Sequence, residues 1–392
     1  MRRGVFLVAA SLFAVGVVLS GCGSSDKSDD SNAINQQDNQ VEVLSLSTTN
    51  KDDRYEKVST SSTNSSTNMG SSNQLVSSTS PMMIISRYIY KTGQTVSYDA
   101  NDDGANQSGI ETDFQRDDQN EIVIDNIRGL IWQDNDDVNS NEMKWDEAVE
   151  YCSNLSLAGR SDWRLPNSDE IMSIVDYSQL NYSIDSAFVN RVKFDYWLSN
   201  SFIYDPNRKA FRVSFNGGYI DVGYKQSSPI WSLGMPDDTW TKFNVRCVSG
   251  IDKNDQKINY TRDNGSGIVT DPSTMKMWQD NRDARYKKLT YSQAIEYCNN
   301  LTLGGYSDWK LPNKNELLSI LDVENFMTNW QLLDKSFKNV NQWSPYVTSS
   351  TFVRDESMAW GVQFGSGRNY LLSKHKYNLY AVRCMRDISD AL

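Results

Sequence analysis

The hydrophobic and polar positions follow one pattern twice along the chain. Residues 148–167 read AVEYCSNLSLAGRSDWRLPN and residues 294–313 read AIEYCNNLTLGGYSDWKLPN, identical at fourteen of twenty positions. The same offset of 146 aligns Trp132-Gln133-Asp134 with Trp278-Gln279-Asp280. A repeat of this length has the size of a domain rather than of a solenoid unit. The pattern therefore predicts two tandem copies of one domain.

Each copy begins with two short apolar runs that predict strands, at 121–125 and 129–133 in the first copy and at 267–271 and 275–279 in the second. A helix is expected next, because apolar side chains recur there at the spacing of one helical face. These side chains are Trp145, Ala148, Val149, Cys152 and Leu155 in the first copy, and Tyr291, Ala294, Ile295, Cys298 and Leu301 in the second.

A second helix is expected after the Leu-Pro-Asn sequence of each copy. Asn167 and Asn313 can cap it, and Glu170 and Glu316 stand three residues later, as a capping box requires. Further on, residues 210–215 and 219–222 flank an Asn-Gly-Gly turn, which predicts a hairpin, and a last strand is expected around Cys247 or Cys384. Each copy is thus predicted to be α+β, with two helices early and antiparallel strands later.

Four of the five cysteines stand at matching places, two in each copy. In an exported protein such cysteines form disulfides. Each copy has to be closed by its own pair, so we predict the bonds Cys152–Cys247 and Cys298–Cys384. A cysteine-ligated metal or a reactive thiol pair is the alternative, although the sequence has neither a CxxC motif nor a nearby histidine for it.

The first residues predict an exported, anchored protein. Arg2 and Arg3 precede an apolar run from Val5 to Leu19, which has the length of a signal-peptide core. The run ends in Leu-Ser-Gly-Cys22, which resembles the lipobox of bacterial lipoproteins, in which the cysteine carries the lipid. We therefore expect a signal peptide over 1–21, lipidation at Cys22 and a membrane anchor in the cell envelope. An ordinary secretory signal with a chance cysteine is the alternative.

Composition divides the rest of the chain into three parts. Residues 22–80 are rich in Ser, Thr and Asn and contain one aromatic residue, Tyr55, so they predict a disordered stalk. The first copy is assigned to 81–250 and the second to 251–392.

The formal net charge of the chain is −11. Residues 81–250 hold 15 Lys and Arg against 26 Asp and Glu, and residues 251–392 hold 18 against 16. This balance argues against nucleic acid as a partner.

Candidate chemistry is sparse. The single histidine, His375, excludes catalytic triads and histidine-ligated zinc sites shared by both copies, so we expect no enzyme activity. Asp99, Asn101 and Asp103 fit the first places of a calcium loop, but Ile110 stands where its glutamate is expected, and a polar turn is the alternative. No other cofactor is expected. Asp134 and Asp280 begin acidic loops that suit either a hard cation or Asx turns, while Trp163 and Trp309 suit either sugar stacking or the core.

Taken together, these motifs resemble the Lcl C-terminal domain family. The resemblance covers about residues 88–250 and 259–388, and rests on Lys91-Thr-Gly-Gln-Thr95, Trp-Gln-Asp, Glu-Tyr-Cys, Asp-Trp-Arg/Lys-Leu-Pro-Asn and Val-Arg-Cys. It implies an exported bacterial domain, and in a collagen-like surface adhesin of the family this domain binds sulfated glycosaminoglycans. A basic cluster suited to such a ligand occurs in the second copy only, at Arg282, Arg285, Lys287 and Lys288.

A more distant resemblance concerns the fold. Trp145-x-x-Ala148-x-x-x-Cys152 is similar to the first helix of C-type lectin-like domains, and Leu-Pro-Asn before a helix is similar to the formylglycine-generating enzyme domain. The resemblance implies two tandem C-type-lectin-like α+β domains, each with two helices and antiparallel strands closed by one disulfide. The resemblance implies neither the sugar binding of true lectins nor the catalysis of the enzyme, because the residues that carry these two activities are missing.

The expected function is that of a lipid-anchored cell-surface binding or adhesion module. Its ligand would be an extracellular glycan, such as a glycosaminoglycan, or a protein, and two copies would raise avidity. Since Gly follows Cys22, the lipoprotein pattern favours the outer membrane, on its surface or its periplasmic face. A structural envelope protein and a carboxylate-dependent enzyme acting on envelope polymers are the alternatives.

Overall fold

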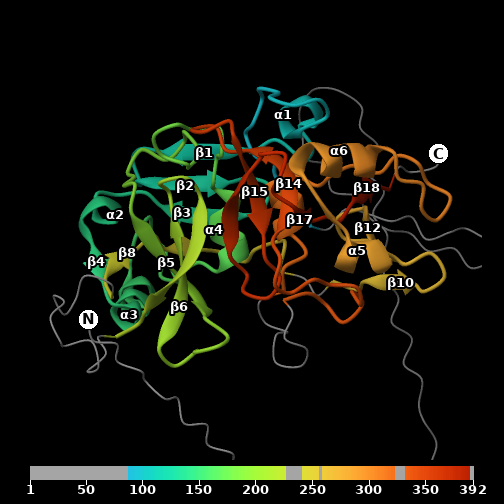
Figure 1. The fold of residues 1–392 in the computed structure, drawn as a ribbon. Coiled ribbons are helices and arrows are strands. Elements are labelled where there is room, and N and C mark those ends of the chain that lie inside the picture. Colours follow the sequence, from blue (N-terminus) through green and yellow to red (C-terminus); the bar gives the residue numbers. More distant parts are fainter. Residues whose placement is uncertain (1–86, 227–240, 256–257, 323–331, 389–392) are drawn as a thin grey trace, which may run out of the picture. The chain divides into compact units, whose positions relative to one another are not determined.

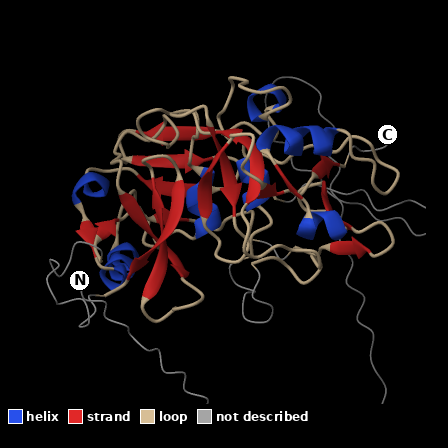
Figure 2. Ribbon diagram, viewed as in Figure 1, coloured by secondary structure: helices blue, strands red, loops and turns tan. Residues whose placement is uncertain are grey.

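Strands dominate the part of the chain that the structure describes. The computed structural model describes residues 87–226, 241–255, 258–322 and 332–388, which belong to one compact unit, Ser77–Leu392. Figure 1 shows its elements, and Figure 2 separates the strands from the short helices. Within these ranges no helix has the length and apolar character needed to cross a membrane. The predicted signal peptide, Cys22 and the stalk lie outside the described residues.

The first copy contains two sheets. One has the order β1-β2-β3-β9 and the other β4-β8-β5-β6-β7, and all paired strands are antiparallel except β5 and β8. The strands are β1 (Phe114–Asp117), β2 (Ile122–Asp125), β3 (Leu130–Gln133), β4 (Glu142–Met143), β5 (Asp195–Ser201), β6 (Lys209–Ser214), β7 (Tyr219–Tyr224), β8 (Phe243–Asn244) and β9 (Val248–Ser249). The helices are α1 (Asp103–Asn106), which precedes β1, α2 (Asp137–Ser140), α3 (Trp145–Asn154) and α4 (Ser168–Ser173).

The second copy has the same strand order. Its sheets run β10-β11-β12-β18 and β13-β17-β14-β15-β16, again with one parallel pair, β14 and β17. The strands are β10 (Thr261–Asp263), β11 (Ile268–Asp271), β12 (Lys276–Gln279), β13 (Lys288–Leu289), β14 (Tyr346–Thr351), β15 (Met358–Val362), β16 (Asn369–Ser373), β17 (Tyr380–Ala381) and β18 (Met385–Asp387). The helices are α5 (Arg282–Tyr286), α6 (Tyr291–Asn299) and α7 (Lys314–Leu318).

Most predicted elements are confirmed. Helices α3 and α6 coincide with the two apolar stripes, and β2, β3, β11 and β12 with the predicted opening strands. Asn167 and Asn313 accept a hydrogen bond from the backbone of Glu170 and Glu316 (2.8 Å each), which completes both capping boxes. The hairpin forms as β6 and β7, and its turn places Gly217 and Gly218 at φ of +121° and +76°, a region that favours glycine.

The predicted fold class is wrong. Four sheets with few, short helices are classed as a four-bladed β-propeller and not as two tandem C-type-lectin-like α+β domains. The difference arises where strands are too short to carry a periodic signal: β4, β8, β13 and β17 have two residues each. The last strand expected around Cys247 is in fact two strands, β8 and β9, which belong to different sheets.

Both predicted disulfides are confirmed. Cys152 pairs with Cys247 and Cys298 with Cys384, across sequence separations of 95 and 86 residues, and all four side chains are fully buried. Cys247 lies between β8 and β9, and Cys384 between β17 and β18. Each bond therefore ties the longest helix of its copy to the point where the chain passes from one sheet to the other.

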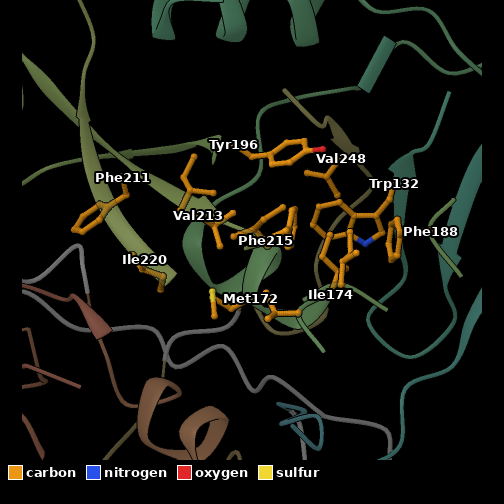
Figure 3. Close-up of a cluster of buried hydrophobic side chains, with 14 of the residues drawn as sticks. Trp132, Met172, Ile174, Phe188, Tyr196, Phe211, Val213, Phe215, Ile220 and Val248 are labelled. Carbon is orange, nitrogen blue, oxygen red and sulfur yellow. The ribbon is translucent and has the colours of Figure 1, made fainter. Parts of the chain in front are cut away.

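The largest core cluster lies mostly in the first copy and includes Trp360 of the second. Figure 3 shows Trp132 beside Phe188, whose ring centroids are 6.4 Å apart, with Ile174 and Val248 close by. Trp163 and Trp309 are 3% and 2% exposed and pack in smaller clusters around the disulfides. These two tryptophans are core residues, so they do not offer a face to a sugar.

A buried lysine joins the two copies. The side chain of Lys314, at the start of α7, is enclosed between the rings of Tyr177 from the first copy and Trp360 from the second, 3.8 and 3.1 Å from their centroids. Its Nζ donates to the carbonyl oxygen of Gly218 (2.9 Å). Burial lowers the pKa of Lys314 well below its usual value. Cation–π attraction and one hydrogen bond therefore offset only part of the hydration that this amine loses on burial.

The disulfides make a testable contribution to stability. Replacing Cys152 and Cys247 together by alanine should lower the free energy of unfolding by up to about 4–5 kcal/mol, because the bond closes a loop of this length. Denaturant unfolding of the variant against the oxidised protein measures this loss. An unchanged unfolding midpoint would show that the bond does not stabilise the native state.

Candidate functional site

A buried ion pair sets the local geometry of each copy. Asp280 follows β12, is fully buried, and accepts hydrogen bonds from the side chains of Arg262 and Arg383, the latter at 3.0 Å. It also accepts from the backbone N–H groups of Lys338 and Asn339, at 2.8 and 3.1 Å. One carboxylate thus joins β10, β12, the loop before β14 and the Val-Arg-Cys segment.

The first copy repeats this arrangement at Asp134. Its carboxylate pairs with Arg116 and with Arg246, the latter at 2.8 Å, and accepts from the backbone N–H of Val189 at 3.0 Å. Two of the sequence motifs, Trp-Gln-Asp and Val-Arg-Cys, therefore meet as a structural network. Asp134 and Asp280 are paired with arginines. Their carboxylate oxygens are therefore already engaged and are not open to a cation.

Helix α5 starts directly beside Asp280. The side chain of Asn281 caps it by accepting from the backbone N–H of Asp283 at 3.1 Å, and Tyr297 donates to the carboxylate of Asp283 at 2.9 Å. Ala284 faces inward and is fully buried. Arg282 and Arg285 of this helix are exposed, whereas Lys287 follows as its C-cap and Lys288 belongs to β13.

Three cations of the cluster are exposed and without a carboxylate partner among the residues that the structure describes: Arg282, Arg285 and Lys288. The fourth, Lys287, is half-buried, lies over the ring of Tyr297 and pairs with Asp283 at 3.2 Å. The structure places the four predicted residues in one stretch that runs from α5 into β13. It also distinguishes three cations available to a ligand from one that is already engaged.

Two exposed aromatic residues belong to α5 and to the loop before β14. Tyr286 is 62% exposed, and the guanidinium groups of Arg282 and Arg285 lie 5.6 and 5.3 Å from its ring centroid. Trp343 is 74% exposed, and Gln363 donates to its carbonyl oxygen at 2.6 Å.

The loop of Trp343 is tied to α5. The side chain of Asn341 donates to the carbonyl oxygen of Arg285 at 3.2 Å and accepts from the N–H of Trp343 at the same distance. We call Arg282, Arg285, Tyr286, Lys287, Lys288 and Trp343 the α5 surface. The two aromatic residues were not predicted from the sequence, although a tryptophan in the polar run Asn341-Gln-Trp-Ser is a signal for an exposed ring.

The first copy carries different chemistry at the same places. The repeat offset of 146 aligns the four cations with Asp136, Asn139, Asn141 and Glu142, which lie in and after α2. The loop before β5 still exposes an aromatic side chain, Phe194, at 67%. The two copies therefore share the scaffold of this surface but have opposite charge on it.

The predicted calcium residues do not converge. Asp99 pairs with Lys374 at 2.7 Å, and Asn101 is exposed, while the side chain of Asp103 is buried and accepts from the hydroxyls of Thr92 and Ser350, at 2.6 and 2.7 Å. No group of three acidic, cysteine or histidine side chains in the described part of the chain is placed to hold a metal ion. The loop is a polar turn in this structure, and calcium binding stays a prediction.

One sequence comparison matches the chain. The family model of the Lcl C-terminal domain covers residues 121–232 and 267–386, in agreement with two copies in tandem. No curated protein matches the sequence.

Asp103 should make stability depend on pH. Burial raises its pKa from 3.8 to about 7, so the folded protein binds a proton there that the unfolded chain releases above pH 4. The free energy of unfolding should therefore fall as the pH rises from about 4 to 7. Asp103→Asn removes this term and can still accept both hydroxyl hydrogen bonds. Urea unfolding at pH 5 and pH 8 should show that the variant gains stability relative to the parent at the higher pH; an equal difference at both values contradicts the assignment.

Proposed function

Because the chain belongs to the Lcl C-terminal domain family, we propose that it is a binding module whose α5 surface recognises a polyanionic extracellular glycan. The observation that carries the proposal is the combination of unpaired, exposed cations with exposed aromatic rings. Arginine forms bidentate hydrogen bonds with sulfate and carboxylate groups, and aromatic rings offer an apolar face to a sugar. A sulfated glycosaminoglycan supplies both kinds of group.

The two copies are proposed to differ in this role. The acidic residues Asp136 and Glu142 replace cations at the equivalent surface of the first copy, and residues 81–250 carry an excess of 11 acidic side chains over the 15 basic ones. A polyanion would be repelled there. The second copy is therefore the one that binds, and the first contributes to the scaffold.

A binding role fits the buried acids better than a catalytic one. Among the carboxylates that recur in both copies, Asp134 and Asp280 follow the repeated Trp-Gln motif; each accepts from two arginines and is fully buried. A general acid or base needs an accessible oxygen within reach of its substrate. We accordingly infer that the protein is not an enzyme.

The location is part of the same proposal. A lipid on Cys22 would hold the chain in the envelope, where the outer membrane is favoured, and residues 22–80 would separate the folded unit from the bilayer. Several acyl chains on one cysteine anchor a protein stably, whereas one chain holds it only marginally. Such an anchor presents the α5 surface to polymers of the envelope or of the surroundings.

A charge exchange tests the binding site. Arg282→Asp, Arg285→Asn, Lys287→Asn and Lys288→Glu give the second copy the residues that the first copy carries on the same backbone. We expect heparin binding, measured by titration calorimetry, to weaken at least about tenfold. The slope of log K against log salt should become shallower by about two to three, by analogy with the roughly 0.7–0.9 per ionic contact seen for nucleic acids.

The matched control lowers the net charge by the same six units in the first copy. Lys193→Glu, Arg208→Glu and Lys209→Glu reverse three cations there and should leave heparin binding within about twofold of the parent. Equal losses in both variants would mean that net charge and not the α5 surface governs binding. Absence of any heparin binding by the parent protein would refute the proposal.

The anchor has its own test. Mass spectrometry of the mature protein from bacterial membranes should find Cys22 as the first residue, carrying acyl chains. Cys22→Ser should move the protein from the membrane fraction to the soluble fraction. A mature chain that begins elsewhere, or a serine variant that stays with the membrane, contradicts the lipoprotein assignment.

A further inference from the structure

The two copies meet along two sheet edges. Strand β7 is the last strand of its sheet in the first copy, and β16 is the last strand of the matching sheet in the second. These strands lie next to each other, yet a side chain rather than a backbone ladder connects them. Asn369 donates to the carbonyl oxygen of Gly218 at 3.1 Å and accepts from the N–H of Ile220 at 2.8 Å.

A groove of about 430 Å³ runs along this joint. This volume falls within the roughly 300–1,000 Å³ of small-molecule sites. The residues of its lining that bear on a ligand are Asp195, Arg212, Tyr219 and Asp221 from the first copy and Arg368 and Tyr370 from the second. Neither copy alone contains the groove.

The charges in the groove cancel. Arg212 pairs with Asp195 and with Asp221, the latter at 3.1 Å, and the Nε of Arg368 lies 3.1 Å from the same Asp221. Two arginines thus share two carboxylates. The α5 surface has three cations that lack such partners, so the two places suit ligands of different charge.

The paired charges suit hydroxyl groups. Guanidinium groups only donate hydrogen bonds and carboxylates only accept them, so alternating Arg and Asp side chains can satisfy both functions of each sugar hydroxyl. A polyanion would bind weakly in this groove, because the carboxylate beside each arginine would repel the polyanion. Arg212 is 15% exposed at its side chain, and burial lowers its pKa, with Arg368 lowering it further.

Two tyrosines complete the lining. One side of Tyr219 rests on Trp360, with ring centroids 5.0 Å apart, which holds the ring in place. The hydroxyl of Tyr370 is oriented by Gln363, whose side-chain oxygen lies at 3.2 Å. Aromatic rings with a fixed orientation are suited to contact the apolar face of a sugar ring.

We propose that the groove between β7 and β16 is a saccharide subsite that takes an uncharged sugar unit. The site needs both copies, and its position is fixed by the contacts that Asn369 and Lys314 make to the same carbonyl oxygen of Gly218. This gives the duplication a function that neither copy could have alone. The subsite is independent of the α5 surface and would select the neutral part of a mixed glycan.

The full chain can be tested against neutral tetrasaccharides, namely cellotetraose, tetra-N-acetylchitotetraose, maltotetraose and xylotetraose, by titration calorimetry. We expect at least one of them to bind. The double variant Arg368→Gln, Tyr370→Ala should weaken that binding by about tenfold or more. The matched control is Lys376→Gln, Tyr377→Ala, which removes another exposed cation and tyrosine in the second copy, 5.2 Å apart, and should bind as the parent does.

Two further arms separate this proposal from the previous one. The four-residue charge exchange in α5 should leave neutral-sugar binding unchanged, and heparin should not compete with the tetrasaccharide. If the double variant unfolds at a lower temperature, Arg368→Gln alone supplies the comparison. The proposal is overturned if no tetrasaccharide binds, if binding survives both groove variants, or if it is lost on the α5 exchange.

Discussion

The buried pair of Asp280 and Arg383 is the interaction on which the proposed binding surface depends. Through this carboxylate, β10, β12, the loop before β14 and the segment that leads to Cys384 share one polar centre. Helix α5 begins two residues after Asp280, and the loop before β14 continues to Trp343. Removing Asp280 would leave the buried guanidinium of Arg383 without its carboxylate partner, which costs several kcal/mol. Asp134 and Arg246 hold the first copy in the same way.

The duplication keeps the scaffold and changes the surface. Both copies retain the buried pair, the disulfide and the capping box, while the positions that face outward in α2 and α5 have opposite charge. Lys314 packs between rings from both copies, so the two form one compact unit. The proposed polyanion site on one copy and the charge-balanced groove at the joint thus belong to the same compact unit.

Local features were predictable from the sequence because short-range physics determines them. The helix of Cys152, the caps at Asn167 and Asn313, and the hairpin turn at Gly217 each follow from spacing or from one residue's conformational preference. The two disulfides followed from the repeat. The assembly into four sheets was not predictable, because strands of two residues have no periodicity and pair only through contacts distant in sequence. In the α5 surface the cations were predicted, but Trp343 lies where the two copies no longer align at a constant offset.

A polyanionic glycan bound at the α5 surface would protect the backbone there from exchange. Hydrogen–deuterium exchange of the full chain with and without a heparin hexasaccharide measures this, because it locates the contact without altering a residue. We expect slower exchange over residues 282–288 and 341–344 and unchanged exchange over residues 136–142. Slower exchange confined to the first copy, or no change in either copy, would contradict binding at the α5 surface.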